Sequence, residues 1–130
     1  MLNSDFKIDR PIFIVGSGRS GTTILYNLLC GHANLAWFSN YSQRWPKYPQ
    51  LALLSWFYTI EPLRRRSIKG LPIPAEAHAL WDYCKPVSDS PGDPPLTEED
   101  ASSKDIARIR KMVALYMRYQ RKPRFINKNQ

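Results

Sequence analysis

The clearest hydrophobic pattern lies near the N-terminus. Residues 12–15 (IFIV) form an uninterrupted apolar run rich in β-branched side chains, which is typical of a strand buried on both faces of a parallel sheet. A glycine-rich segment follows at residues 16–21. Residues 22–30 (TTILYNLLC) then have helical character, with Gly31 as a C-terminal cap and with apolar side chains on one face at Ile24, Leu25, Leu28 and Leu29. This succession predicts the first half of a βαβ unit over residues 12–31.

A second well-patterned region lies at the other end of the chain. Thr97, followed three positions later by Asp100, resembles the start of a helix. Apolar residues then recur at three- and four-residue spacing, at Ile106, Ile109, Val113 and Tyr116. A proline follows and would stop the helix. The pattern therefore predicts a helix over residues 97–122 and a second strand over residues 124–128, with Lys128 at its carboxyl end.

The stretch between these two regions has weaker signals and holds most of the 11 prolines. We expect an irregular helical insert over residues 33–96, with short helices at 51–59 and 74–83 and a loop at 88–95. The chain would then be a single domain over residues 1–130. Its predicted fold class is α/β, a P-loop NTPase-like three-layer α/β/α arrangement with a parallel sheet, present here incompletely.

The loop at residues 16–23 (GSGRSGTT) is close to the phosphate-binding pattern G-x-x-x-x-G-K-[ST]. Its glycines let successive N–H groups turn into one concavity, and the following helix N-terminus adds partial positive charge, so an anionic phosphate is the natural occupant. Thr22 replaces the lysine of that pattern, and a cation stands at Arg19 instead. A Mg²⁺-bound triphosphate needs strong charge neutralisation at the transferring group, so this loop favours a smaller anion.

The string from Gly18 to Thr23 (GRSGTT) is similar to the 5′-phosphosulfate-binding loop of sulfotransferases that use 3′-phosphoadenosine 5′-phosphosulfate (PAPS). A weaker similarity extends to residues 28–34 (LLCGHAN), which look like the family's first helix and the turn after it. Residues 125–129 (FINKN) look like its second strand, where a lysine commonly ends the strand and a proline follows shortly. Gln130 stands in place of that proline. The chain thus resembles the N-terminal part of a bacterial-type sulfotransferase.

The resemblance implies a role for each matching residue. Arg19 would contact the phosphosulfate and stabilise charge on the bridging oxygen, and Lys128 would orient the sulfuryl group. Backbone N–H groups and hydroxyls of the loop would hold the 5′-phosphate, without a metal. The implied donor site consists of Gly16, Ser17, Gly18, Arg19, Ser20, Gly21, Thr22 and Thr23. The alternative for the loop is a tight turn that binds nothing. The alternative for Lys128 is a solvated lysine at the end of a strand.

Sulfuryl transfer to a hydroxyl benefits from a general base near the acceptor. The family uses a His or a carboxylate outside the loop, and Glu76 in the segment PAEAHALW is the first candidate here. The next candidates for the base are His78, Asp82 and His32. The alternative for Glu76 is an ordinary exposed helix position.

The charge balance points to an anionic partner. The chain has 19 Lys and Arg against 11 Asp and Glu, giving a formal charge of +8. A nucleotide, a phosphorylated or sulfated ligand, nucleic acid or a membrane surface would all suit it, as would simple solvation of a basic surface. The two cysteines fit neither metal-ligand spacing nor a disulfide framework, and the longest apolar run, at residues 51–60, is too short to span a bilayer. We expect a cytoplasmic protein.

Two other functions remain open from the sequence. The first is a nucleoside or small-molecule kinase. Thr22 in place of the lysine and the lack of an acidic strand end for Mg²⁺ count against it. The second is a non-catalytic basic module in which residues 104–124 bind nucleic acid or an anionic surface. Our first hypothesis is a sulfotransferase with PAPS as nucleotide co-substrate, an unidentified hydroxyl or amine acceptor, and no nucleic acid partner. Because the family holds the 3′-phosphate with an Arg and a Ser after a third strand, we expect this chain to be a portion of a longer one.

Overall fold

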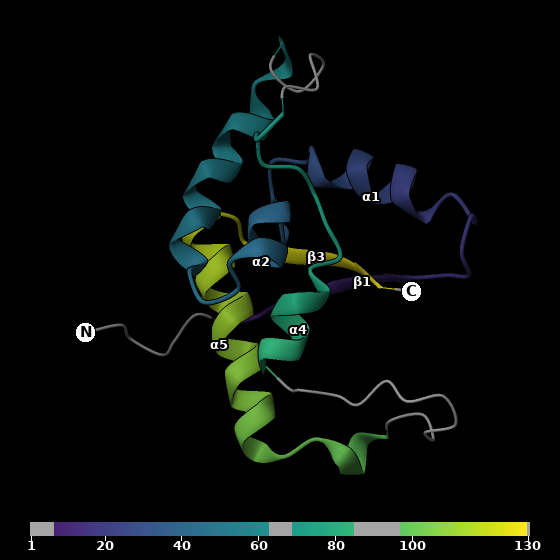
Figure 1. Ribbon diagram of the computed structural model, residues 1–130, viewed down its shortest axis with the longest axis vertical. Helices are drawn as coiled ribbons and strands as arrows, with labels where there is room; N and C mark the ends of the chain where they lie inside the picture. Colours follow the sequence, from purple (N-terminus) through teal and green to yellow (C-terminus); the bar gives the residue numbers. More distant parts are fainter. Residues whose placement is uncertain (1–6, 63–68, 85–96, 130) are drawn as a thin grey trace.

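The computed structural model describes residues 7–62, 69–84 and 97–129 (Figure 1). Helical elements separate the strands, and five of them follow one another between β2 and β3 in this part of the chain. In order, the elements are β1 (Ile12–Val15), α1 (Thr22–Cys30), β2 (Leu35–Ala36), α2 (Asn40–Arg44), the 3₁₀ helix η1 (Pro49–Thr59), α4 (His78–Cys84), the 3₁₀ turn η2 (Glu98–Asp100), α5 (Ser103–Gln120) and β3 (Arg124–Asn129).

The described strands form a three-stranded parallel sheet in the order β1-β3-β2. β3 is central: its Asn129 lies opposite Val15 of β1, and its Arg124 lies opposite Leu35 of β2. The pattern of apolar residues predicted β1 and β3 but missed β2, which has two residues and lies in the predicted irregular insert. The predicted α/β class with a parallel sheet is confirmed.

Helices cover both faces of the sheet, as the neighbours Phe125 and Ile126 show. Both side chains are fully buried, and because they are consecutive in a strand they point to opposite faces. Phe125 belongs to a core that includes Val113, Tyr116 and Met117 of α5. Ile126 belongs to a second core with residues of α1 and β2. The arrangement therefore has a helical layer, a sheet and a second helical layer (Figure 1).

The side chains that α1 buries differ from its apolar stripe. Tyr26 and Cys30 are buried against the sheet. Ile24, Leu25 and Leu28 are exposed. The buried face of α1 is thus the one that carries the tyrosine hydroxyl and the thiol.

The predicted helix over residues 97–122 consists of two pieces. Thr97 and Asp100 form a capping box as expected, but it begins only the short turn η2. A second capping box, formed by Ser102 and Asp105, begins α5. Two consecutive caps therefore divide the segment, and the long amphipathic helix starts six residues later than predicted.

The segment around Pro74 also differs from its prediction. A helix was expected over residues 74–83, whereas α4 begins at His78. Pro74 forms an antiparallel bridge with Ser39, and the Ala75 N–H donates to the Phe38 carbonyl at 3.0 Å. The chain before α4 is therefore extended and paired. The predicted helix at 51–59 is the 3₁₀ helix η1, and the predicted loop at 88–95 lies outside the described residues.

Candidate functional site

The glycine loop lies at the carboxyl edge of the sheet, between the end of β1 and the start of α1. In the parallel pairing of β1 with β3, Ile14 is opposite Lys128. Lys128 therefore lies beside the end of the strand from which the loop departs. This edge is where open α/β sheets bind their ligands.

The loop has a tightly determined conformation. The Ser20 hydroxyl donates to the Ser17 carbonyl at 2.7 Å. A Cβ added to Gly16 would lie 2.8 Å from both Ser20 Oγ and Thr22 Cγ2, so only glycine fits there without a shift of its neighbours. Arg19 has the left-handed backbone angle φ 62°, which is costly for a residue with a side chain and is typical of functional loops.

The N-terminus of α1 opens onto this loop. Gly21 is its N-cap residue, with φ 80°, and supplies no side-chain cap. The first turn carries no acidic residue. The N–H groups of that turn and the helix dipole therefore face the loop without a side-chain acceptor or a negative charge, an environment that suits an anion.

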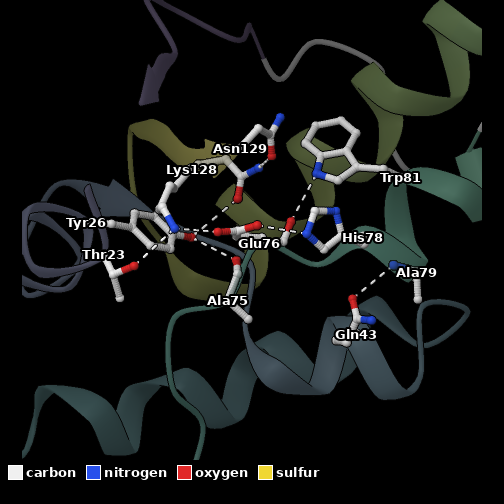
Figure 2. A network of polar contacts seen from close by, with 11 residues as sticks. Thr23, Tyr26, Gln43, Ala75, Glu76, His78, Ala79, Trp81, Lys128 and Asn129 are labelled. Atoms are coloured by element: carbon white, nitrogen blue, oxygen red, sulfur yellow. Dashed lines mark hydrogen bonds and ion pairs between the residues drawn. The ribbon is translucent and has the colours of Figure 1, made fainter. Parts of the chain in front are cut away.

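Lys128 joins the loop helix to a carboxylate (Figure 2). Its side chain is 4% exposed, and its Nζ donates to Thr23 Oγ1 at 3.0 Å and to Glu76 Oε1. The strand-end lysine that the sequence allowed to be solvated is thus buried and paired. A buried ammonium is tolerable only with such partners, because desolvation of an unpaired charge is expensive.

Glu76 lies between Lys128 and His78. Its Oε2 is 2.8 Å from His78 Nε2, and its side chain is 20% exposed, against 62% for His78. Burial raises the pKa of Glu76, but hydrogen bonds from Lys128 and His78 outweigh burial and hold that pKa below its ordinary value. The carboxylate is therefore ionised at neutral pH.

Backbone contacts fix the segment that carries Glu76. The Trp81 indole N–H donates to the Glu76 carbonyl at 3.1 Å, and the Ala79 N–H donates to the side chain of Gln43 at 2.9 Å (Figure 2). Ala77 is buried and has the left-handed angle φ 57°. This sharp turn separates Glu76 from α4, so Glu76 is not the exposed helix position that was its alternative.

The structure brings together three of the predicted positions, Thr23, Glu76 and Lys128. Arg19 lies in the glycine loop that precedes Thr23, and its side chain is exposed. Asp82 is an exposed residue of α4, and the His32 ring accepts a hydrogen bond from the Asn34 N–H at 3.1 Å in the turn after α1.

Sequence reasoning missed the polar side chains that surround these positions. Asn127, the residue before Lys128, is fully buried, and its amide donates to Asn129 Oδ1 at 2.8 Å. The Tyr26 hydroxyl reaches the same region from α1. A buried asparagine inside an apolar strand was the available signal, because such a side chain requires partners.

A model of the sulfotransferase family matches residues 11–122. The chain belongs to this family. The matched residues include the glycine loop and Glu76, and they end before β3 and Lys128. No curated protein and no solved structure gives a significant match. Membership indicates a transferase that moves a sulfuryl group.

Two absences apply to residues 7–62, 69–84 and 97–129, the part of the chain that the structure describes. None of the helices there is long and apolar enough to cross a membrane. In the same ranges, no three His, Cys, Asp or Glu side chains are grouped as a metal site would require.

Proposed function

We propose that this chain carries the donor-binding and base-supplying part of a sulfotransferase that moves the sulfuryl group of PAPS to a hydroxyl or amine acceptor. The observation that supports the proposal most is the position of Lys128. Its ammonium contacts Thr23 at the start of the loop helix and Glu76 on the other side. A donor held by the loop and an acceptor deprotonated by Glu76 would therefore both lie next to the Lys128 ammonium.

The donor half of the proposal rests on the loop. The backbone N–H groups of the first turn of α1, with the Thr22 and Thr23 hydroxyls, bind the 5′-phosphate. The Arg19 guanidinium neutralises charge on the oxygen that bridges phosphorus and sulfur. Such preorganised donors are effective because they need no rearrangement as charge develops, and removing one typically costs roughly 10²–10³ in rate.

The acceptor half rests on Glu76. The acceptor oxygen bonds to sulfur, its proton passes to the Glu76 carboxylate, and the bond from sulfur to the 5′-phosphate oxygen breaks. The products are the sulfated acceptor and 3′-phosphoadenosine 5′-phosphate. Glu76 can take the proton because it is ionised at neutral pH and keeps part of its surface accessible, but its lowered pKa makes it a weaker base than an unpaired glutamate.

Binding of 3′-phosphoadenosine 5′-phosphate tests the donor half. Under the proposal this nucleotide raises the Tm of the chain, and Arg19→Ala removes the rise, because the loop loses its cation. Arg10→Ala is the matched control: Arg10 is also an exposed arginine with a positive φ, 41°, but it precedes β1 and pairs with Asp9. The control keeps the full rise.

Three results would contradict the donor assignment. The folded chain could show no rise in Tm at millimolar nucleotide. ATP with Mg²⁺ could produce a larger rise than the 3′-phosphorylated nucleotide, which would favour a kinase. Binding of DNA or RNA that falls steeply with salt and is indifferent to Arg19→Ala would favour a basic binding module.

A further inference from the structure

The buried hydroxyl of Tyr26 lies where the elements of the candidate site meet. Tyr26 is on α1, one turn after Thr23, and is 2% exposed. Its hydroxyl oxygen is 3.2 Å from the Ala75 carbonyl oxygen, 3.4 Å from Asn127 Oδ1 and 3.5 Å from the Phe38 carbonyl oxygen. Figure 2 shows the ring reaching from α1 toward Ala75, beside Lys128.

One hydroxyl proton serves one acceptor at a time, so the distances decide which bond dominates. The Ala75 carbonyl is the nearest, and it belongs to the peptide bond that leads into Glu76. The Phe38 carbonyl already accepts the Ala75 N–H at 3.0 Å. Asn127 Oδ1 is the alternative acceptor and lies beside Lys128 in β3. The peptide units around Ala75 are thus fixed from the sheet on one side and from α1 on the other.

Burial keeps this hydroxyl in its donor form. Desolvation, with smaller contributions from Cys30 and Glu76, raises the pKa of Tyr26 well above its ordinary value. The hydroxyl therefore keeps its proton at neutral pH. A permanent donor facing a backbone carbonyl fixes the position of that carbonyl rather than responding to pH.

We infer that Tyr26 is a positioning residue that fixes Glu76 relative to Thr23 and Lys128. It does so by holding the Ala75 carbonyl from the same helix that begins at the glycine loop. The functional meaning of this role rests on the proposed function, because Glu76 needs a fixed position only if it serves the acceptor. The contact itself is independent of that proposal and is testable without substrate.

The first test compares Tyr26→Phe with Tyr116→Phe. Each variant removes only a hydroxyl, from side chains that are 2% and 1% exposed. The Tyr116 hydroxyl bonds to Ser42 instead of Ala75, so it is a matched control. The Glu76 carboxyl is followed by ¹³C NMR as the pH is lowered, in chains labelled at glutamate.

Tyr26→Phe is expected to raise the pKa of Glu76 toward its ordinary value, because Glu76 loses its alignment with Lys128 and His78. Tyr116→Phe is expected to leave the Glu76 titration as in the wild type. A loss of packing alone would not distinguish the two variants in this way. An unchanged titration in folded Tyr26→Phe, or equal changes in both variants, overturns the inference.

The second test uses the wild type and does not depend on the folding of a variant. Exchange of the hydroxyl proton for deuterium shifts the ¹³C resonance of a carbonyl that accepts its hydrogen bond. The Ala75 carbonyl is expected to show this isotope shift, and its absence overturns the inference. Failure of the nucleotide to bind would instead count against the proposed function and would leave both NMR results standing.

Discussion

The Lys128 ammonium forms an ion pair with the Glu76 carboxylate, 52 positions earlier in the chain. The two side chains are unequally buried, 4% exposed for Lys128 and 20% for Glu76. Lys128 has Thr23 as its other partner, a neutral hydroxyl, while Glu76 also has His78. The lysine therefore depends on the pair more than the glutamate does.

This inequality predicts the order of stabilities in a double-mutant cycle. Glu76→Gln leaves a buried ammonium with neutral partners and is expected to cost about 2–4 kcal/mol of the free energy of unfolding, since breaking a buried pair leaves an uncompensated charge. Lys128→Met leaves a carboxylate that is partly hydrated and still contacts His78, so its cost is smaller. The double variant is expected to lose about 1–3 kcal/mol less free energy of unfolding than the two single variants lose together.

Denaturant unfolding of the four chains measures the cycle. Equal costs for the two single variants would contradict the argument from burial. Additive costs would show that the pair contributes no coupling and that each residue acts through its other contacts.

The lowered pKa of Glu76 predicts how stability depends on acidity. Its contribution is complete above the pKa of an unfolded glutamate, roughly 4.3, and is lost as the pH falls through the lower pKa of the folded state. The stability gap between the wild type and Glu76→Gln is therefore widest near neutral pH and closes on acidification. Tm measured across a pH series follows the gap.

The Lys128→Met background is the control for this pH dependence. Without the Lys128 ammonium, the main cause of the lowered pKa of Glu76 is gone. The stability difference between Lys128→Met and the double variant should therefore depend less on pH than the difference between the wild type and Glu76→Gln. A gap that is constant with pH, or that widens in acid, would contradict the assignment.

The sequence determined β1, the loop and β3 well because their signals are local. A continuous apolar run and a glycine pattern each specify their own conformation. The same holds for the caps at Thr97 and Ser102, although only the first was recognised. With two caps in succession, the first begins a single turn and the second begins the helix.

The parts that sequence reasoning missed depend on contacts between distant residues. β2 is two residues long, and its strand conformation comes from pairing with β3. Pro74 is suited to the first turn of a helix, but its pairing with Ser39 keeps it extended. Glu76 was a candidate base by its residue type, but no local signal could place it beside Lys128, since that contact spans 52 positions.

The glycines of the loop give a final prediction, because two of them differ in the space around them. A Cβ on Gly16 would lie 2.8 Å from Ser20 Oγ and from Thr22 Cγ2, whereas a Cβ on Gly18 would meet no atom within 4 Å. Gly16→Ala is expected to destabilise the chain by about 1–3 kcal/mol, the usual cost of overpacking. It should also weaken binding of 3′-phosphoadenosine 5′-phosphate, because Thr22 must move.

Gly18→Ala is the matched control for the fold, since the added methyl group has room. Its free energy of unfolding should equal that of the wild type within about 0.5 kcal/mol, as for a surface substitution. Denaturant unfolding and nucleotide titration of both variants provide the comparison. Equal stability of the two variants would show that the contact of Gly16 with Ser20 and Thr22 does not determine the loop. Loss of stability in Gly16→Ala with undiminished nucleotide binding would separate the loop conformation from the donor site.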